Sequence, residues 1–427
     1  MADFDAAIVG AGVAGCTAAY LLAKAGLEVI LVERGNFAGS KNMTGGRLYS
    51  HSLEKIMPNF AAEAPVERRI AKEKVSFLTG DSMTTLDFQS QRLAQTGSDS
   101  YTVLRSKFDR WLADKAEAAG VNLVTGIRVD ELLRRDGKIA GIKAGDDEIE
   151  TDVVILADGV NSLLAQQAGF KKELTPHQVA VGVKEIIELP AQTIEERFNV
   201  SPGEGASWLF VGCTEGGIGG GFLYTNTDSI SLGIVLTLSE IENLKTSVPE
   251  LLNQFKVHPA IQPLIKGGKL VEYSAHLVPE AGQSMLPQLC GDNILVVGDA
   301  AGLVINIGYM VRGMDLAIAS AECAAQTVIA AKARGDFSAA SLADYQTKLK
   351  AGFVGNDLNL YRNFPRFLEK TPRMFETYPE LAAQVMTDLF MIDGRPARRL
   401  SRKVLGRLKT VGFLNLAKDG IGGMGAL

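Results

Sequence analysis

Three glycines near the N-terminus, Gly10, Gly12 and Gly15, have the clearest chemical purpose in this sequence. At these spacings glycine permits a tight turn, lets the backbone approach a pyrophosphate and allows a helix to pack closely on a strand. Glu33 follows eighteen residues after Gly15 and is placed to accept hydrogen bonds from the hydroxyls of an adenosine ribose. The pattern predicts a dinucleotide site. Glu33 disfavours a 2′-phosphate there, and adjacent Arg34 weakens this argument only slightly.

The segments around the turn supply the elements that it needs. Residues 4–9 are an apolar run typical of a buried strand, and residues 16–25 are an Ala- and Leu-rich run typical of a helix. Gly26 is suited to end that helix, and residues 27–32 form a second strand pattern. A lone G-x-G-x-x-G motif is a weak signal that an ordinary glycine-rich turn also satisfies. Strand, turn, helix, strand and acid together favour dinucleotide binding.

Two later motifs distinguish between FAD and NAD. Asp158-Gly159 follows a strand pattern at 151–156, and Gly298-Asp299 follows another at 293–297. Both carboxylates therefore come at the carboxyl end of a buried strand, where α/β sheets bind their ligands. An NAD dehydrogenase does not need a further carboxylate such as Asp299, which follows a strand of the same sheet more than 250 residues after the glycine turn. FAD is longer and carries a ribityl chain with several hydroxyls, so the motifs favour FAD.

The three motifs together resemble those of the glutathione-reductase-like flavoproteins, in which all of them belong to one FAD domain. The resemblance implies that Asp299 holds a ribityl hydroxyl, and a helix N-cap is the alternative for this residue alone. It also implies that a helix starting near Gly313 points its N-terminus at the flavin and stabilises negative charge on the reduced ring. Related flavoproteins place arginines like Arg47 and Arg105 near the cofactor, and the alternative for each is a surface salt bridge.

The predicted cofactor-contacting residues combine the glycine turn, the acids, the arginines and the later motifs. They are Gly10, Ala11, Gly12, Val13, Ala14, Gly15, Glu33, Arg34, Arg47, Arg105, Val129, Asp299, Gly302 and Gly313. No catalytic acid, base or nucleophile and no metal ligand is predicted, because FAD itself carries the redox chemistry. Of the four histidines only His276 attracts notice, and a structural role is expected for it.

Longer segments of the chain resemble the electron-transfer-flavoprotein–quinone oxidoreductases, and specifically their short FixC type. These segments are 40–49, 103–109, 219–226, 268–276, 312–317 and 413–420. The resemblance extends through essentially the whole chain. It implies that electrons arrive from a two-subunit electron transfer flavoprotein, rest on FAD and leave toward quinone.

The cysteines bear on compartment and on partners. Cys16, Cys213, Cys290 and Cys323 lie far apart, and none forms a C-x-x-C pair. This usage fits a reducing cytoplasm and predicts no iron–sulfur cluster in the chain. Long members of the family carry an iron–sulfur domain at the C-terminus, from which this chain departs. The resemblance therefore implies a separate ferredoxin-like iron–sulfur protein and a multi-subunit complex.

Length and charge set broad limits. The 427 residues suggest two or three domains, and 44 basic against 49 acidic residues argue against a nucleic-acid partner. Two apolar stretches, 6–23 and 316–331, are better explained as buried soluble elements than as membrane spans, so no transmembrane helix is predicted. The expected location is the cytoplasm, and peripheral binding to the inner face of the membrane is an open alternative.

The expected fold class is α/β. A Rossmann-like FAD-binding domain of the glutathione-reductase type is interrupted by an antiparallel β-sheet substrate or quinone domain and followed by a mostly helical C-terminal region. Short β-rich runs at 179–189, 206–213, 219–224 and 229–238 predict the antiparallel sheet. The predicted divisions are 1–75, 101–170 and 276–335 for the FAD domain, 76–100 for an excursion into the substrate domain, 171–275 for that domain and 336–427 for the helical region.

Two segments keep alternatives open. Eight basic residues and no acidic one lie between 395 and 418, interleaved with apolar residues. This amphipathic stretch suits anionic lipid, an acidic ferredoxin-like partner or a plain solvated helix. The triple glycine at 219–221 permits close approach to flavin or quinone, and a bulge or turn is an equal alternative.

Three other functions compete with the electron relay. Flavin monooxygenases share the fold and usually continue past the G-D motif with a histidine and a proline, whereas residues 302–307 hold neither. Prenyl reductases of the same superfamily also tend to carry a proline there. A flavin-bearing subunit without turnover of its own is the third alternative.

Overall fold

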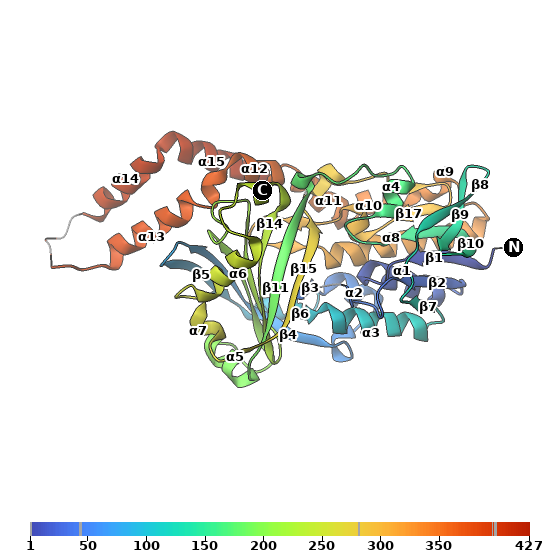
Figure 1. Cartoon of the computed structure of the whole chain (residues 1–427), viewed down its shortest axis with the longest axis horizontal. Helices are drawn as coiled ribbons and strands as arrows, with labels where there is room; N and C mark the ends of the chain where they lie inside the picture. Colours follow the sequence, from blue (N-terminus) through green and yellow to red (C-terminus); the bar gives the residue numbers. More distant parts are fainter. Residues whose placement is uncertain (1, 42–44, 281, 395, 397–398) are drawn as a thin grey trace.

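The computed structural model of the chain describes residues 2–41, 45–280, 282–394, 396 and 399–427. Figure 1 shows three regions along the longest axis: a sheet with the N-terminus, a second sheet of long strands, and C-terminal helices that extend beyond that sheet. The predicted fold class is confirmed, because an α/β unit, a largely antiparallel sheet and a helical C-terminal region are all present.

The first sheet has a parallel core of five strands in the order β17-β10-β1-β2-β7. These strands are β1 (Phe4–Val9), β2 (Val29–Glu33), β7 (Asn122–Thr125), β10 (Asp147–Leu156) and β17 (Ile294–Val296). The central strands are covered on both faces, which explains why their sequences are continuous apolar runs rather than alternating ones. The hairpin β8 (Glu131–Arg135) and β9 (Lys138–Ala144) extends from β10, and β16 (Cys290–Gly291) pairs with β17.

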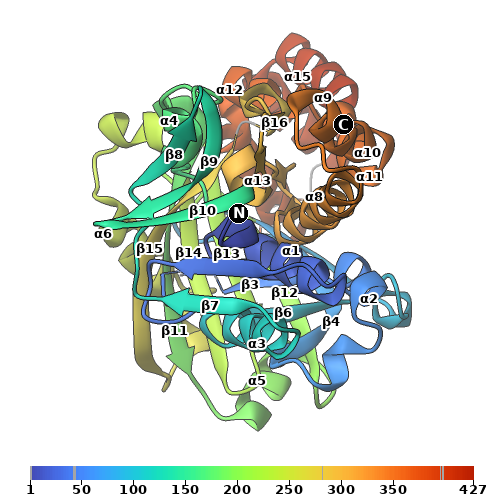
Figure 2. The same ribbon diagram turned by 90° about the vertical axis from the view of Figure 1, so that its right-hand side faces the viewer.

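The long helix of the first region is α8 (Met314–Arg334), which lies against α1 (Val13–Lys24). Figure 2, turned by 90°, shows α8 grouped with the neighbouring helices beside α1. Among the described residues, α8 is the one helix long and apolar enough to cross a bilayer, and 72% of its most apolar window is buried inside the protein. The other helices here are α2 (His51–Ile56), α3 (Arg105–Ala118), α4 (Leu163–Gln167), α9 (Ala339–Leu342), α10 (Asp344–Ala351) and α11 (Phe353–Leu360).

The second sheet has nine strands, in the order β15-β11-β14-β13-β12-β4-β6-β3, with β5 beside β4. All neighbours are antiparallel except β12 and β4. The strands come from two stretches of chain. They are β3 (Gly45–Tyr49), β4 (Val66–Leu78), β5 (Met83–Gln89), β6 (Ser100–Leu104), β11 (Val179–Glu188), β12 (Glu204–Val211), β13 (Gly219–Thr225), β14 (Ser229–Thr237) and β15 (Lys269–Pro279).

The two faces of the nine-stranded sheet have different neighbours. One face forms a separate hydrophobic core with α5 (Ala191–Phe198), α6 (Val248–Val257) and α7 (Gln262–Ile265). Successive side chains of a strand point to opposite faces, so the remaining residues of the same strands face the first region. On β14, for example, Ile234 belongs to the separate core while Val235 faces a cavity between the two sheets.

The C-terminal helices are α12 (Phe364–Lys370), α13 (Thr377–Phe390), α14 (Leu400–Val411) and α15 (Phe413–Ala426). Helix α13 packs against β4 and β5, and α14 folds back along α13 (Figure 1). Arg407 on α14 pairs with Asp388 on α13 at 2.9 Å. Asp419 on α15 accepts hydrogen bonds from Arg373 at 2.7 Å and from the Tyr378 hydroxyl at 2.6 Å, which ties α15 to α13.

One close approach of main chains sets the position of α1, and it predicts an effect of mutation. A methyl group at Gly15 would lie 1.9 Å from the Gly10 carbonyl oxygen, so Gly15→Ala must displace the helix from the turn. We expect a loss of about 1–3 kcal/mol in the free energy of unfolding, measured by urea denaturation. Gly420→Ala on α15 meets no atom within 4 Å and should be neutral or stabilising by about 0.5–1 kcal/mol. Equal stability of the two variants would contradict the packing argument.

Candidate functional site

A cavity of about 820 Å³ lies between the two sheets. One side is formed by the segments that follow the carboxyl ends of β1, β2, β10 and β17 and by the N-terminus of α8. The opposite side is the free face of the nine-stranded sheet. Segments far apart in sequence therefore meet in one space, at the edge of the parallel sheet where α/β proteins bind their ligands.

The glycine turn forms one end of the cavity. Gly10 has a φ of +100°, and a methyl group there would lie 2.4 Å from the Ala157 carbonyl oxygen, so only glycine fits. Gly12 is the N-cap of α1, and no side chain caps the helix or places an acid in its first turn. The first N–H groups of a helix lack intrahelical partners, and the helix dipole favours an anion beside them. Gly12, Val13 and Ala14 line the cavity, so this end can hold a phosphate.

Glu33 ends β2 and fixes the loops around it. Its carboxylate oxygens accept hydrogen bonds from the Ala11 N–H at 2.9 Å and the Gly35 N–H at 2.7 Å. Each oxygen has a second acceptor position, because a carboxylate offers about four lone-pair sites. Glu33 is nearly buried and lines the cavity, so it can accept hydrogen bonds from a ligand while it holds the turn.

Two further carboxylates face the cavity with acceptor capacity left over. The Asp299 carboxylate lines the cavity without a side-chain hydrogen bond or ion pair among the described residues, and burial raises its pKa above the ordinary value against the charges of Arg105 and Lys171. Val297, not Asp299, occupies the N-cap position of the short helix that follows β17. The buried Oδ1 of Asp158 is also unpartnered, and burial raises the pKa of this carboxyl to about 6. Both groups are placed to bind ligand hydroxyls.

The N-terminus of α8 opens into the same space. Gly313 is its N-cap residue and lines the cavity together with Met314. The preceding Arg312 is held by Asp315 at 2.6 Å and by Asp357 at 2.6 Å, which fixes the approach of the chain to the helix. The positive end of the α8 dipole therefore faces the cavity from a constrained position.

The two predicted arginines are mostly buried, and both are paired rather than free. Arg105 forms a bidentate pair with Asp109 at 2.6 and 2.7 Å, and Asp109 is fully buried. Burial opposes the charge of Arg105, but Asp109 raises the pKa of the guanidinium above its ordinary value. Arg47 pairs with Glu73, donates to the Ser100 hydroxyl at 2.9 Å and lines the cavity with Arg105.

Most of the predicted residues meet in this cavity. Gly10, Gly12, Val13, Ala14, Glu33, Arg34, Arg47, Arg105, Val129, Asp299 and Gly313 line it. Three of the predicted residues do not line it. The Ala11 N–H donates to Glu33, and Gly15 packs against the Gly10 carbonyl beneath the turn. Gly302 has a φ of +70° and lies close to Met285. Within the predicted family segment 40–49, residues 42–44 lie outside the described residues, as do 395, 397 and 398 of the basic stretch.

Two residues that position the site are missing from the sequence prediction. Asp109 stands four residues after Arg105, a helical spacing that the sequence does display. Lys171 donates to the Val160 carbonyl at 3.2 Å, the Ser162 hydroxyl at 2.7 Å and the Ala300 carbonyl at 3.3 Å. Lys171 therefore joins the loops after β10 and β17, and no local sequence motif indicates this role.

The sheet side of the cavity is mostly apolar. Leu209 and Val211 on β12 and Val235 on β14 are typical of it. On β11 to β15 the polar side chains of this wall are Tyr224, Thr237 and His276, with Glu280 directly after β15. Arg47 stands apart from them, on β3 at the edge of the same sheet. The cavity thus has a charged side with glycine turns and an apolar side, which suits a long polar cofactor beside an apolar reactant.

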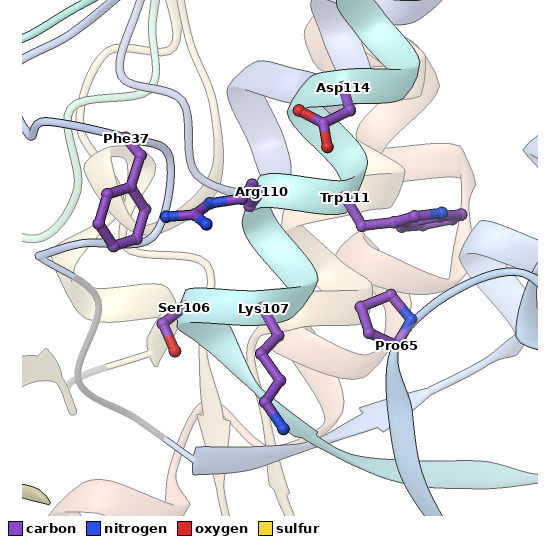
Figure 3. Close-up of a pocket in the computed structure, with 7 residues that line it drawn as sticks. All are labelled: Phe37, Pro65, Ser106, Lys107, Arg110, Trp111 and Asp114. Carbon is purple, nitrogen blue, oxygen red and sulfur yellow. The ribbon is translucent and has the colours of Figure 1, made fainter.

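A second hollow of about 390 Å³ lies on the surface beside α3 (Figure 3). Figure 3 shows Arg110 directed toward Phe37 and Trp111 beside Pro65. The Arg110 guanidinium lies 3.9 Å from the centre of the Phe37 ring, and Lys107 pairs with Glu67 at 3.1 Å. Its basic groups are thus engaged within the protein, and the candidate site is the large cavity.

Three family models match the chain. The first is described as an FAD binding domain and matches residues 3–217. The second, described as ETF-QO, ubiquinone-binding, matches residues 179–278, and the third, the ETF-QO/FixC family C-terminal domain, matches residues 364–427. With the unpartnered carboxylates and the glycine turn of the cavity, the FAD binding domain identifies the cofactor as FAD.

Curated relatives match along the whole chain. The chain is 53% identical to the probable electron transfer flavoprotein-quinone oxidoreductase YdiS of Escherichia coli strain K12, over 99% of both chains. It is 54% identical to Protein FixC of the same strain, again over 99% of both. Among solved structures, a geranylgeranyl bacteriochlorophyll reductase-like protein from Thermoplasma acidophilum has a TM-score of 0.71 and 19% identity, over 98% of this chain and 99% of that one. The structural likeness concerns the fold alone.

The free carboxylates of the cavity generate a prediction on cofactor binding. We expect Asp299→Ala and Glu33→Ala each to lower FAD affinity about tenfold or more, because hydrogen bonds to charged groups contribute about 1.5–3 kcal/mol. FAD content of the purified protein, from the flavin-to-protein absorbance ratio, measures the effect. Asp147→Ala removes an exposed acid at the other end of β10 and serves as the control. Full flavin occupancy in both cavity variants would refute these roles.

Proposed function

This chain belongs to the ETF-QO/FixC family of FAD-dependent oxidoreductases, and from that premise we propose that it relays electrons from an electron transfer flavoprotein to a quinone. The observation that carries the proposal is the division of the cavity into a charged side and an apolar side. A cofactor held on one side can reach a hydrophobic acceptor held on the other.

On the charged side, we assign the pyrophosphate of FAD to Gly10, Gly12 and the N-terminus of α1. Glu33 binds the adenosine ribose, Asp299 binds a ribityl hydroxyl, and the N-terminus of α8 faces the flavin. The contacts described above support these assignments, because each group lines the cavity with hydrogen-bonding capacity to spare. Bound FAD can accept two electrons and release them singly.

On the apolar side, the free face of the nine-stranded sheet receives the quinone. The ubiquinone-binding family model covers β11 to β14 and most of β15, which are the strands of this wall. Gly220 and Gly221 on β13 also line the cavity and let the backbone approach the acceptor. Apolar contact is the main attraction that a quinone ring and its hydrophobic tail can offer.

A separate ferredoxin-like iron–sulfur protein completes the proposed complex, together with the two subunits of the electron transfer flavoprotein. The four cysteines support this arrangement, because they lie on α1, after β12, on β16 and on α8. Four-cysteine clusters need their ligands close together, so an iron–sulfur centre is assigned to the partner.

We also assign a peripheral contact with the inner face of the membrane to the basic stretch 395–418. Shortly before this stretch in sequence, the last residue of α13 and the two residues that follow it are apolar and exposed: Phe390 at 79%, Met391 at 63% and Ile392 at 93%. Exposed apolar residues next to basic ones are typical of protein surfaces that lie on anionic lipid. The combination favours lipid over an acidic protein partner.

Anaerobic reduction tests the electron relay. Reduced electron transfer flavoprotein should bleach the FAD absorbance of this protein, and added quinone should restore it. NADPH alone should leave the spectrum unchanged. Rapid bleaching by NADPH, followed by reoxidation with oxygen and hydroxylation of a substrate, would instead identify a monooxygenase. Bleaching by neither donor would favour a flavin-bearing subunit that needs its partners.

Vesicle flotation tests the membrane contact. The protein should float with vesicles of phosphatidylglycerol and much less with vesicles of phosphatidylcholine. Phe390→Ser with Ile392→Ser should reduce flotation about tenfold or more, because burying each apolar side chain contributes about 1.5–3 kcal/mol. Val257→Ser, which removes a 66% exposed apolar side chain on α6, is the matched control. Unchanged flotation of the double variant, with loss of ferredoxin-like partner binding, would assign this surface to the protein partner.

A further inference from the structure

Among the described residues, the apolar wall of the cavity holds one imidazole and one carboxyl side chain. His276 lies within β15, and Glu280 directly follows that strand. Tyr224 is also on this wall, but burial raises the pKa of its phenol well above the ordinary value. Any proton delivered from the wall to a reactant in the cavity therefore comes from His276 or Glu280.

Glu280 joins the apolar wall to the segment that follows β17. Its backbone N–H donates to the Gln178 carbonyl at 2.9 Å, which continues the pairing of β15 with the chain before β11. Its carboxylate accepts a hydrogen bond from the Asn306 amide at 3.2 Å. Asn306 lines the cavity on the same stretch of chain as Asp299. Glu280 therefore stands where the quinone wall meets the proposed FAD-binding segment.

The surroundings of Glu280 favour its protonated form. Burial raises the pKa of this carboxyl to about 7, and the hydrogen bond from Asn306 only partly opposes the shift. A general acid works best when its pKa lies near the operating pH. His276 is different, because burial together with the charges of Arg105 and Arg34 lowers its pKa. The imidazole is therefore neutral and carries no extra proton.

Other ionisable groups near Glu280 are engaged or remote from its carboxylate. They include His177 before β11, Lys184 on β11, His276 on β15, and Tyr309 and Arg312 on the chain after Asn306. His177 is exposed, Lys184 pairs with Glu272 at 3.3 Å, and Arg312 is held by Asp315. None of these described groups is paired with Glu280, so its proton is not tied up in an ion pair.

We propose that Glu280 is the catalytic acid that protonates the quinone, an inference that rests on the proposed electron relay. The quinone gains two electrons and two protons and becomes the quinol. Reduced FAD, when bound, would supply both electrons and one proton. The second proton comes from Glu280, whose O–H bond breaks as an O–H bond forms on a quinone carbonyl oxygen. The resulting carboxylate then takes a proton from water.

The test compares two oxidants that differ in their need for protons. Chemically reduced FAD-loaded protein is mixed without oxygen with a short-chain ubiquinone analogue or with ferricenium, which takes up one electron and no proton. Glu280→Gln should slow reoxidation by the quinone about 100-fold, the usual size of a general-acid effect, and leave ferricenium unaffected. The wild-type rate with quinone should fall as the pH rises through about 7, because the acid form is lost, and this fall should vanish in the variant.

Controls separate a chemical role from a structural one. Glu280→Asp keeps the carboxyl and should retain the pH dependence, and FAD content should be equal in all variants. Infrared difference spectra of the oxidised protein should show a carboxylic-acid band that titrates near pH 7 and is absent from Glu280→Gln. His276→Gln, on the same wall, should keep the fall in rate.

Each contrary outcome has a defined meaning. Unchanged quinone reoxidation in Glu280→Gln, equal loss with both oxidants, or loss of the pH dependence in His276→Gln instead would overturn the assignment of Glu280. Reduced wild-type protein that reacts with ferricenium but not with quinone would count against the proposed relay itself.

Discussion

The close approach of three stretches of main chain at the end of β1 is the constraint on which the rest of the site depends. The turn at Gly10 passes the Ala157 carbonyl after β10, and Gly15 of α1 rests on the Gly10 carbonyl. Neither contact leaves space for a side chain. Since Glu33 also binds the Ala11 and Gly35 N–H groups, the turn, α1 and the loop after β2 are locked together. The end of the cavity to which we assign the phosphates is therefore held in place by main-chain contacts and by Glu33 without any ligand.

Buried charge is the second organising feature. Arg105 is neutralised by Asp109 in a bidentate pair, Arg47 by Glu73, and Arg312 by Asp315 and Asp357. Asp109 and Asp315 are buried, and removing the partner of such a carboxylate leaves an uncompensated charge, which typically costs about 3–5 kcal/mol. These pairs fix the arginines in place along the charged side. Asp158 and Asp299 differ, because each retains acceptor capacity toward the cavity.

The separation of charged and apolar sides gives the proposed chemistry its direction. Electrons would enter a cofactor held by dipoles and carboxylates and leave toward an acceptor held by apolar contact. An acceptor that becomes a quinol also needs protons, and an apolar wall supplies few. Glu280 is the exception on that wall, because burial without a charged partner raises its pKa toward neutrality. The same exclusion of water that favours quinone binding thus also raises the pKa of Glu280 and keeps its carboxyl group protonated near neutral pH.

Much of the FAD side could be predicted from sequence because its signals are local. Strand, glycine turn, helix and acid follow one another within the first 33 residues, and β1 has the predicted bounds. The predicted start of the helix was wrong. Helix α1 begins at Val13 rather than at residue 16, so the last glycine of the motif is already helical. The pairing of Asp109 with Arg105 could have been predicted from their four-residue spacing. Lys171, in contrast, contacts loops that are distant in sequence, so its role could not be predicted.

The sequence by itself determined the cofactor class, the two kinds of sheet and the family, because these depend on glycine positions and on periodic patterns along the chain. Tertiary structure decided which side chains share the cavity. A carboxylate such as Glu280 has no distinguishing neighbours in sequence, and its pKa depends on burial against β11, β18 (Ile305–Asn306) and the apolar wall. Desolvation is a property of the folded surroundings, so only the fold could single out this acid.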